Sequence, residues 1–164
     1  SLDTMLIART ATPVDIFSGR DIGFGVFNFR PDRLEGVPLY LQDPSAAGGR
    51  TINRAAFAVP HDSRQGTLGR NSLRGFPVTQ LNLALRRSLK LNERLNLQLR
   101  AEIFNLFNHP NFGDPVGDLG SGLFGQSTAM FGRSLGSGGA NGGLSPLYQL
   151  GGPRSVQLML KLQF

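Results

Sequence analysis

Three segments of the chain alternate between apolar and polar residues with a period of two. Successive side chains of a β-strand point to opposite faces, so this alternation predicts strands with one apolar and one polar face. The apolar sets are Leu81, Leu83, Leu85 and Leu89; Leu95, Leu97, Leu99, Ala101 and Ile103; and Val156, Leu158, Leu160, Leu162 and Phe164.

The middle segment has a competing interpretation, because Leu95, Leu99, Ile103 and Leu106 would also form one stripe of a helix. Leu97 lies off that stripe, as does Phe104, and the alternation recurs in two other segments. We therefore favour a strand.

We expect strands at about residues 2–12, 78–89, 95–107 and 154–164. The connection at 91–94 is short, whereas those at 13–76 and 108–152 are long and contain many turn-forming residues. Irregular loops of such length are uncommon in compact soluble domains. Strands of about 9–11 residues, short periplasmic turns and longer extracellular loops are typical of outer-membrane barrels.

These features predict an all-β fold: the last four antiparallel strands of a transmembrane outer-membrane β-barrel with long extracellular loops. The chain begins at Ser1 without a signal peptide and ends on Phe164. We interpret it as a C-terminal fragment that has too few strands to close a barrel, with Phe164 as the true end of the barrel. A secreted β-sandwich binding module is an alternative, because alternation alone does not separate inward-facing from outward-facing leucines.

In the barrel interpretation the apolar face contacts lipid and the polar face lines the lumen. Arg87 is an exception on the apolar face, and we expect it to extend towards the interface. The predicted lipid-facing residues are Leu83, Leu85, Leu97, Leu99, Leu158 and Leu160. The predicted lumen-facing residues are Gln80, Asn82, Arg86, Gln98, Arg100, Glu102, Gln157 and Lys161.

Aromatic residues suggest two further roles. Phe104, Phe107 and Phe112 fit either an interfacial aromatic girdle or packing at the base of a loop, with Phe107 the best girdle candidate. The last apolar set is also a candidate signal for the barrel-assembly machinery, and it comprises Leu158, Leu160, Leu162 and Phe164.

Composition removes several function classes. The chain contains no cysteine, which excludes disulfides, thiol nucleophiles and cysteine-ligated zinc. The net charge is +6, but the arginines are scattered and form no clustered basic face, so we expect no nucleic-acid binding. No apolar run is long enough for a transmembrane helix.

Candidate chemistry is weak. His61, Asp62 and Ser63 are adjacent in sequence, whereas a catalytic triad is recognised by geometry rather than adjacency. Asn111, Asp114 and Asp118 lack the ordered spacing of a calcium loop, and the glycine tract at 136–143 lacks the Lys-Ser/Thr of a phosphate loop. We predict no enzyme activity, no catalytic residues, no cofactor and no metal.

Several blocks resemble one family. Residues 100–113, RAEIFNLFNHPNFG, resemble a block near the end of Oar-like TonB-dependent receptors, and residues 66–75, GTLGRNSLRG, resemble another. Arg30-Pro31-Asp32, residues 57–60 (FAVP) and the closing segment 152–164 resemble further landmarks. The blocks occur in the expected order over nearly the whole chain.

The resemblance implies a receptor in a Gram-negative outer membrane for energised passage of a large or scarce solute. It also implies a plug domain inside the barrel and a TonB-contacting segment near the N-terminus, neither of which lies in these residues. The implied partners are outer-membrane lipid, the rest of the barrel and its plug, TonB, and the barrel-assembly machinery. A passive porin or a structural outer-membrane barrel is the alternative function.

Overall fold

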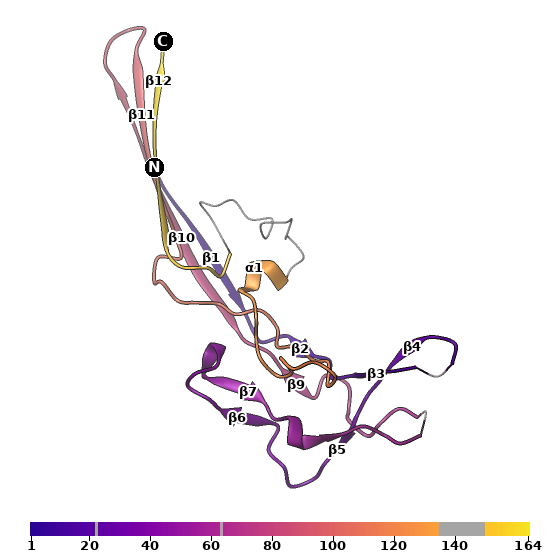
Figure 1. The fold of residues 1–164 in the computed structure, drawn as a ribbon. Coiled ribbons are helices and arrows are strands. Elements are labelled where there is room, and N and C mark those ends of the chain that lie inside the picture. Colours follow the sequence, from indigo (N-terminus) through magenta and orange to yellow (C-terminus); the bar gives the residue numbers. More distant parts are fainter. Residues whose placement is uncertain (22, 63, 135–149) are drawn as a thin grey trace. The chain divides into compact units, whose positions relative to one another are not determined.

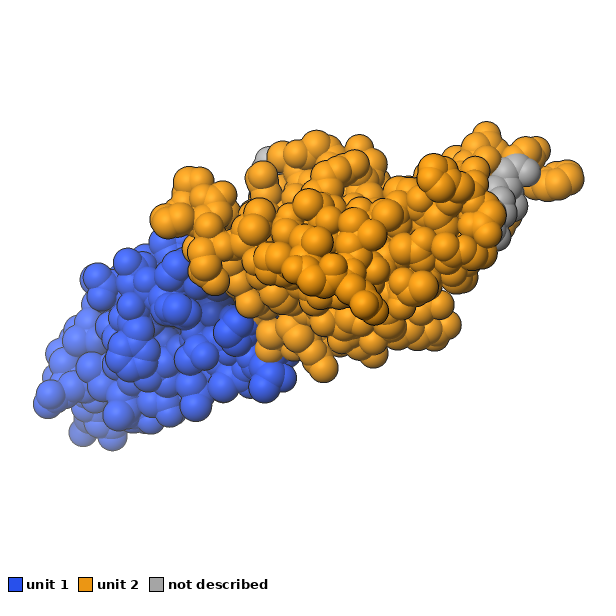
Figure 2. Space-filling view, turned by 90° about the horizontal axis from the view of Figure 1, so that it is seen from below, with its two compact units in different colours: residues 1–10, 77–111, 130–164 blue, residues 11–76, 112–129 orange. Residues whose placement is uncertain are grey.

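The computed structural model describes residues 1–164 except 22, 63 and 135–149. The chain divides into two compact units, which Figure 2 colours separately. Unit 1 comprises residues 1–10, 77–111 and 130–164, and unit 2 comprises residues 11–76 and 112–129.

Unit 1 is built on a four-stranded antiparallel sheet with the order β1-β10-β11-β12 (Figure 1). The sheet is open in the described residues, with β1 and β12 at its edges, which confirms the predicted all-β fold. The helical alternative for residues 95–106 is wrong. The strands are β1 (Leu2–Arg9), β10 (Val78–Lys90), β11 (Asn96–Phe104) and β12 (Ser155–Gln163). Unit 1 also contains one helical turn, α1 (Phe131–Ser134).

The register of the sheet gathers the leucines on one face. Leu85 pairs with Leu2 on one side and with Ala101 on the other, and Ala101 pairs with Leu158. The neighbouring row joins Arg87, Leu99 and Leu160, so Arg87 does lie on the apolar face. Leu85 is 55% exposed and Leu158 is 78% exposed, so nothing in the described chain covers this face.

A tight turn joins β10 to β11. The backbone N–H of Leu91 donates to the carbonyl of Leu95 at 2.9 Å, and the N–H of Arg94 donates to the Asn92 side chain at 2.9 Å. An asparagine that accepts from a backbone N–H two residues on stabilises such turns. The short connection predicted at 91–94 is therefore a hydrogen-bonded hairpin turn.

Unit 2 differs from the sequence expectation. The sequence predicts an irregular loop for residues 13–76, yet they form short paired strands and two 3-10 turns around a core. The pairs are β2 (Pro13–Val14) with β9 (Leu73–Arg74), β3 (Ser18–Asp21) with β4 (Val26–Phe29), β5 (Asp32–Arg33) with β8 (Phe57–Ala58), and β6 (Tyr40–Gln42) with β7 (Arg50–Ile52). The turns are η1 (Ala47–Gly49) and η2 (Arg54–Ala56).

The core of unit 2 joins two distant segments of the chain. Residues 112–129 contribute Leu119 and Phe124, and the Phe124 ring packs edge-on against Phe57 with 6.0 Å between centroids. Ile52 donates its N–H to the carbonyl of Gly125 at 3.1 Å. The two long connections predicted from the sequence thus share one hydrophobic core. The residues from the first connection are Val14, Ile16, Ile52, Ala56, Phe57, Leu68 and Leu73.

Residues 30–32 hold residues 64–68 against them. The N–H of Gly66 donates to the carbonyl of Arg30 at 2.8 Å, and that of Leu68 donates to the carbonyl of Pro31 at 3.1 Å. The Asp32 carboxylate accepts from the N–H of Thr67 at 2.9 Å. The backbones approach so closely that a Cβ on Gly66 would lie 2.1 Å from the carbonyl carbon of Pro31.

This close approach makes Gly66 a sensitive position. We expect Gly66→Ala to destabilise unit 2 by about 1–3 kcal/mol, because the added methyl must push two backbones apart. Gly122→Ala is the matched control, since a Cβ there meets nothing within 4 Å. The temperature at which residues 11–76 become sensitive to protease measures the effect. A fall of equal size in both variants would contradict this account.

Candidate functional site

The eight polar residues predicted to line a lumen lie on one face of the sheet. Arg86 pairs with Arg100, Gln98 pairs with Ser88 and Lys161, and Glu102 pairs with Gln157. Directly paired residues of an antiparallel sheet project to the same side, and the side alternates along each strand. Gln80 and Asn82 share this side at the start of β10. Whether this face lines a barrel lumen stays a prediction.

The polar face carries more positive than negative charge. Arg86 and Arg100 are opposite each other, and Lys161 lies diagonally from Arg100 across the β11–β12 pair. Arg100 forms an ion pair with Glu102 on its own strand, while its Nε is buried without a hydrogen-bond partner. This surface can therefore accept an anionic group from a neighbouring part of the protein or from a solute.

Four amide side chains are buried where the sheet meets its connections within unit 1. Gln80, Asn105 and Asn111 are each 1% exposed, and Asn82 is 6% exposed. The Gln80 amide donates to Asn82 Oδ1 at 2.9 Å, and the N–H of Asn105 donates to the same oxygen at 3.0 Å. Buried polar groups are costly unless they are hydrogen-bonded, so these contacts hold the region together.

Asn105 and Asn111 connect the end of β11 to the rest of unit 1. The Asn105 amide donates to the carbonyls of His109 and Gly152 at 2.9 and 2.7 Å, and its Oδ1 accepts from the N–H of His109 at 3.1 Å. Asn111 makes two bonds with the backbone of Thr79, of 2.8 and 3.0 Å. Gly151 donates its N–H to Gln80 Oε1 at 2.8 Å.

The alternation of apolar and polar residues does not identify Asn105 as a structural residue. Its backbone φ is 52°, and that of Asn108 is 51°, a left-handed conformation that asparagine tolerates better than most residues. The available signal was the recurrence of asparagine in FNLFNHPNF directly after an alternating strand. Asparagine at a strand end provides both a left-handed turn and a side chain that bonds the backbone.

The three phenylalanines have different surroundings. Phe112 packs edge-on against Phe76 in unit 2, with 5.7 Å between ring centroids. Phe107 is 72% exposed and Phe104 is partly buried. Phe112 therefore packs within a folded connection, while Phe107 keeps the exposure that a girdle residue needs.

The remaining candidate chemistry is dispersed. His61 is exposed, Asp62 pairs with Arg64 at 3.1 Å, and Ser63 lies outside the described residues, as does the glycine tract 136–143. Asp114 accepts from the Thr12 hydroxyl at 2.7 Å, and Asp118 accepts from the N–H of Gly120 at 2.8 Å. No group of three or more metal-binding side chains occurs in the described part of the chain.

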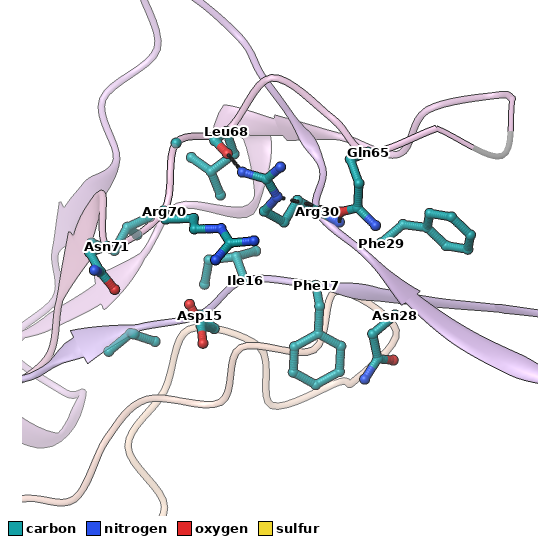
Figure 3. Close-up of a pocket in the computed structure, with 13 residues that line it drawn as sticks. Asp15, Ile16, Phe17, Asn28, Phe29, Arg30, Gln65, Leu68, Arg70 and Asn71 are labelled. Carbon is teal, nitrogen blue, oxygen red and sulfur yellow. Dashed lines mark hydrogen bonds between the residues drawn. The ribbon is translucent and has the colours of Figure 1, made fainter.

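Unit 2 contains a cavity of about 720 Å³, drawn in Figure 3. It lies between the segment after β2, the end of β4 and residues 65–73. The lining includes two arginines, Arg30 and Arg70, and one carboxylate, Asp15. This volume falls within the range of small-molecule sites in proteins.

An ion pair fixes the segment beside this cavity. Arg64 donates to both carboxylate oxygens of Asp32, at 2.9 and 2.7 Å. The hydrogen bond from Arg64, followed by that from the N–H of Thr67, lowers the pKa of Asp32 below its ordinary value. The same contact raises the pKa of Arg64.

Comparison with known proteins identifies the class of this chain. Residues 1–141 match the family model described as Outer membrane beta barrel domain. The chain belongs to this family, which indicates a location in the outer membrane. It matches no curated protein and no solved structure. No helix in the described residues is long and apolar enough to cross a membrane.

Asn105 is the first position to test. Asn105→Asp keeps the size and the tolerance for positive φ, but it removes both donated bonds and buries a carboxylate. We expect a loss of about 1–3 kcal/mol in the free energy of unfolding. Asn108→Asp is the control, because Asn108 is exposed, has the same φ and uses its Oδ1 only as an acceptor for the N–H of Arg154. Urea unfolding in detergent measures both, and equal losses would rule out the proposed role of the donated bonds.

The lowered pKa of Asp32 predicts a pH dependence. A carboxylate with a depressed pKa stabilises the fold above its unfolded-state pKa, and this contribution disappears as pH falls through the folded-state value. Asp32→Asn should therefore accelerate hydrogen exchange at residues 64–68 relative to the unmodified protein at neutral pH, with a difference that shrinks in acid. Glu35→Gln, at an exposed residue with no ion pair in the described chain, should change nothing. A difference that persisted undiminished in acid would argue against this role.

Proposed function

We propose that the chain is the C-terminal part of a TonB-dependent receptor barrel for energised passage of a large or scarce solute. The folded connections carry this proposal. Unit 2 has its own core and a cavity of about 720 Å³, which a passive pore does not require. The family match supports a barrel, and the resemblance of residues 66–75 and 100–113 to Oar-like receptors supports the TonB-dependent class.

The two faces of the sheet fit this role. The leucine face is exposed along β12, where Leu158 and Leu160 are 78% and 68% exposed, which suits contact with lipid. The opposite face carries Arg86, Arg100 and Lys161, which suits a lumen that holds a plug. The proposed partners are outer-membrane lipid, the remaining strands with their plug, TonB and the barrel-assembly machinery.

Two measurements on the intact protein separate an energised receptor from a passive porin. A plugged receptor should bind the purified periplasmic domain of TonB and show little conductance in a planar bilayer. A porin should show steady conductance and no TonB binding. Steady conductance without TonB binding would overturn the proposal in favour of the porin.

The facing of the sheet can be tested at adjacent positions of β11. Leu99→Arg should cost about 2–4 kcal/mol of refolding stability in lipid, because it places a charge on the lipid-facing side. Gln98→Arg is the matched control, since it adds the same group to the polar face and should have little effect. Losses of equal size would refute the assignment of the two faces.

We also propose that the last strand is an assembly signal. Leu158, Leu160 and Leu162 share the apolar face of β12, and Phe164, which follows the strand, is fully exposed. An aromatic ring suits a boundary that is apolar on one side and wet on the other. Deletion of Phe164 should slow insertion in cells more than it lowers refolding stability in detergent, and an equal effect in both assays would leave only a packing role.

A further inference from the structure

One of the two arginines that line the cavity of unit 2, Arg30, is held in place by hydrogen bonds. Arg30 Nη1 donates to the carbonyl of Leu68 at 3.1 Å, and its Nε donates to Gln65 Oε1 at 3.4 Å. The same Gln65 oxygen accepts from the backbone N–H of Arg30 at 3.0 Å. The guanidinium is therefore held in one orientation while its Nη2 keeps its donors for a ligand.

The side chain of the second arginine, Arg70, has no partner in the described chain. Arg70 forms no hydrogen bond or ion pair within the described residues, yet it lines the same cavity, and Figure 3 shows its guanidinium on the same inner side as that of Arg30. Asp15 also lines the cavity without an ion pair in the described chain. Two arginines against one carboxylate leave the wall with one net positive charge.

This charge suits a monoanion. The planar guanidinium matches a carboxylate through two parallel N–H···O bonds, and two such groups can share one carboxylate. Phosphate offers similar oxygens, but as a dianion it would leave negative charge uncompensated beside Asp15. The charge balance therefore favours a carboxylate.

The neutral part of the lining indicates the rest of the ligand. Asn28 and Asn71 present amides whose side chains have no partner in the described structure, and amides both donate to and accept from hydroxyl groups. Phe17 and Leu68 add apolar surface between the polar groups. A lining with both amide and apolar groups fits a small ligand that carries several hydroxyl groups and also has apolar faces.

We propose that this cavity binds a hydroxylated monocarboxylate, of which a sugar acid is the simplest example. Arg30 and Arg70 bind the carboxylate, and the two asparagines bind hydroxyls. The site goes beyond the proposed transport function, because binding to the purified protein needs neither TonB nor energy.

The test is calorimetric titration of the intact receptor in detergent micelles. The probes are D-galacturonate, D-galactose and inorganic phosphate. Galacturonate has a carboxylate where galactose has a neutral hydroxymethyl group. We expect galacturonate to bind at least about tenfold more tightly than galactose. Arg70→Gln should weaken the binding of galacturonate at least about tenfold. Arg94→Gln removes the same charge from the exposed β10–β11 turn and should leave this affinity unchanged.

Arg70 is the decisive variant because its side chain has no structural bond to lose. Arg30→Gln should weaken binding too, and its melting temperature shows whether the bond to Leu68 was also needed for folding. Absence of galacturonate binding, equal binding of the two sugars, or an Arg70→Gln protein that binds as before would overturn the proposal. Binding of phosphate without galacturonate would overturn it in favour of a phosphate site.

Discussion

The antiparallel ladder of the four long strands holds unit 1 together, and its register decides where each of its side chains lies. Because the side-chain period is two, a slip of one residue would move every leucine to the opposite face. The register observed places Leu85, Ala101 and Leu158 in one row and Arg86 beside Arg100 on the other side. One set of backbone hydrogen bonds thus creates both the apolar surface that a membrane requires and the charged surface opposite it.

Where such a ladder ends, backbone groups lose their strand partners and need other hydrogen-bond partners. After Phe104 the chain turns through the left-handed Asn105, whose N–H bonds the Asn82 side chain in place of a strand partner. The next residue returns to the ladder, since the N–H of Leu106 donates to the carbonyl of Leu81 at 2.8 Å. The buried amides therefore take over from backbone pairing at the point where the strands diverge.

The long strands could be predicted because their signal is local. Alternation over nine to thirteen residues identifies a strand without knowledge of its neighbours. The strands of unit 2 contain two to four residues, too few for a period to be visible. The core of unit 2 contains both Val14 and Leu119. No pattern within either segment predicts that it packs against residues about a hundred positions away. The same holds for Asn105, whose partners come from β10 and from residue 152.

The block at residues 66–75 shows how structure separates two kinds of motif residue. Gly66 is required because two backbones meet there, Leu68 and Leu73 are buried in the core, and the Thr67 hydroxyl accepts from the N–H of Arg33 at 3.1 Å. Ser72 donates to the carbonyl of Gly69 at 2.6 Å. The side chains of Arg70 and Asn71 have no such task in the described structure, although the φ of 56° at Asn71 explains why that position favours asparagine. The guanidinium of Arg70 therefore has no bond to the described chain and lies at the edge of a cavity that also contains the hydrogen-bonded Arg30, which is why we propose a ligand for it.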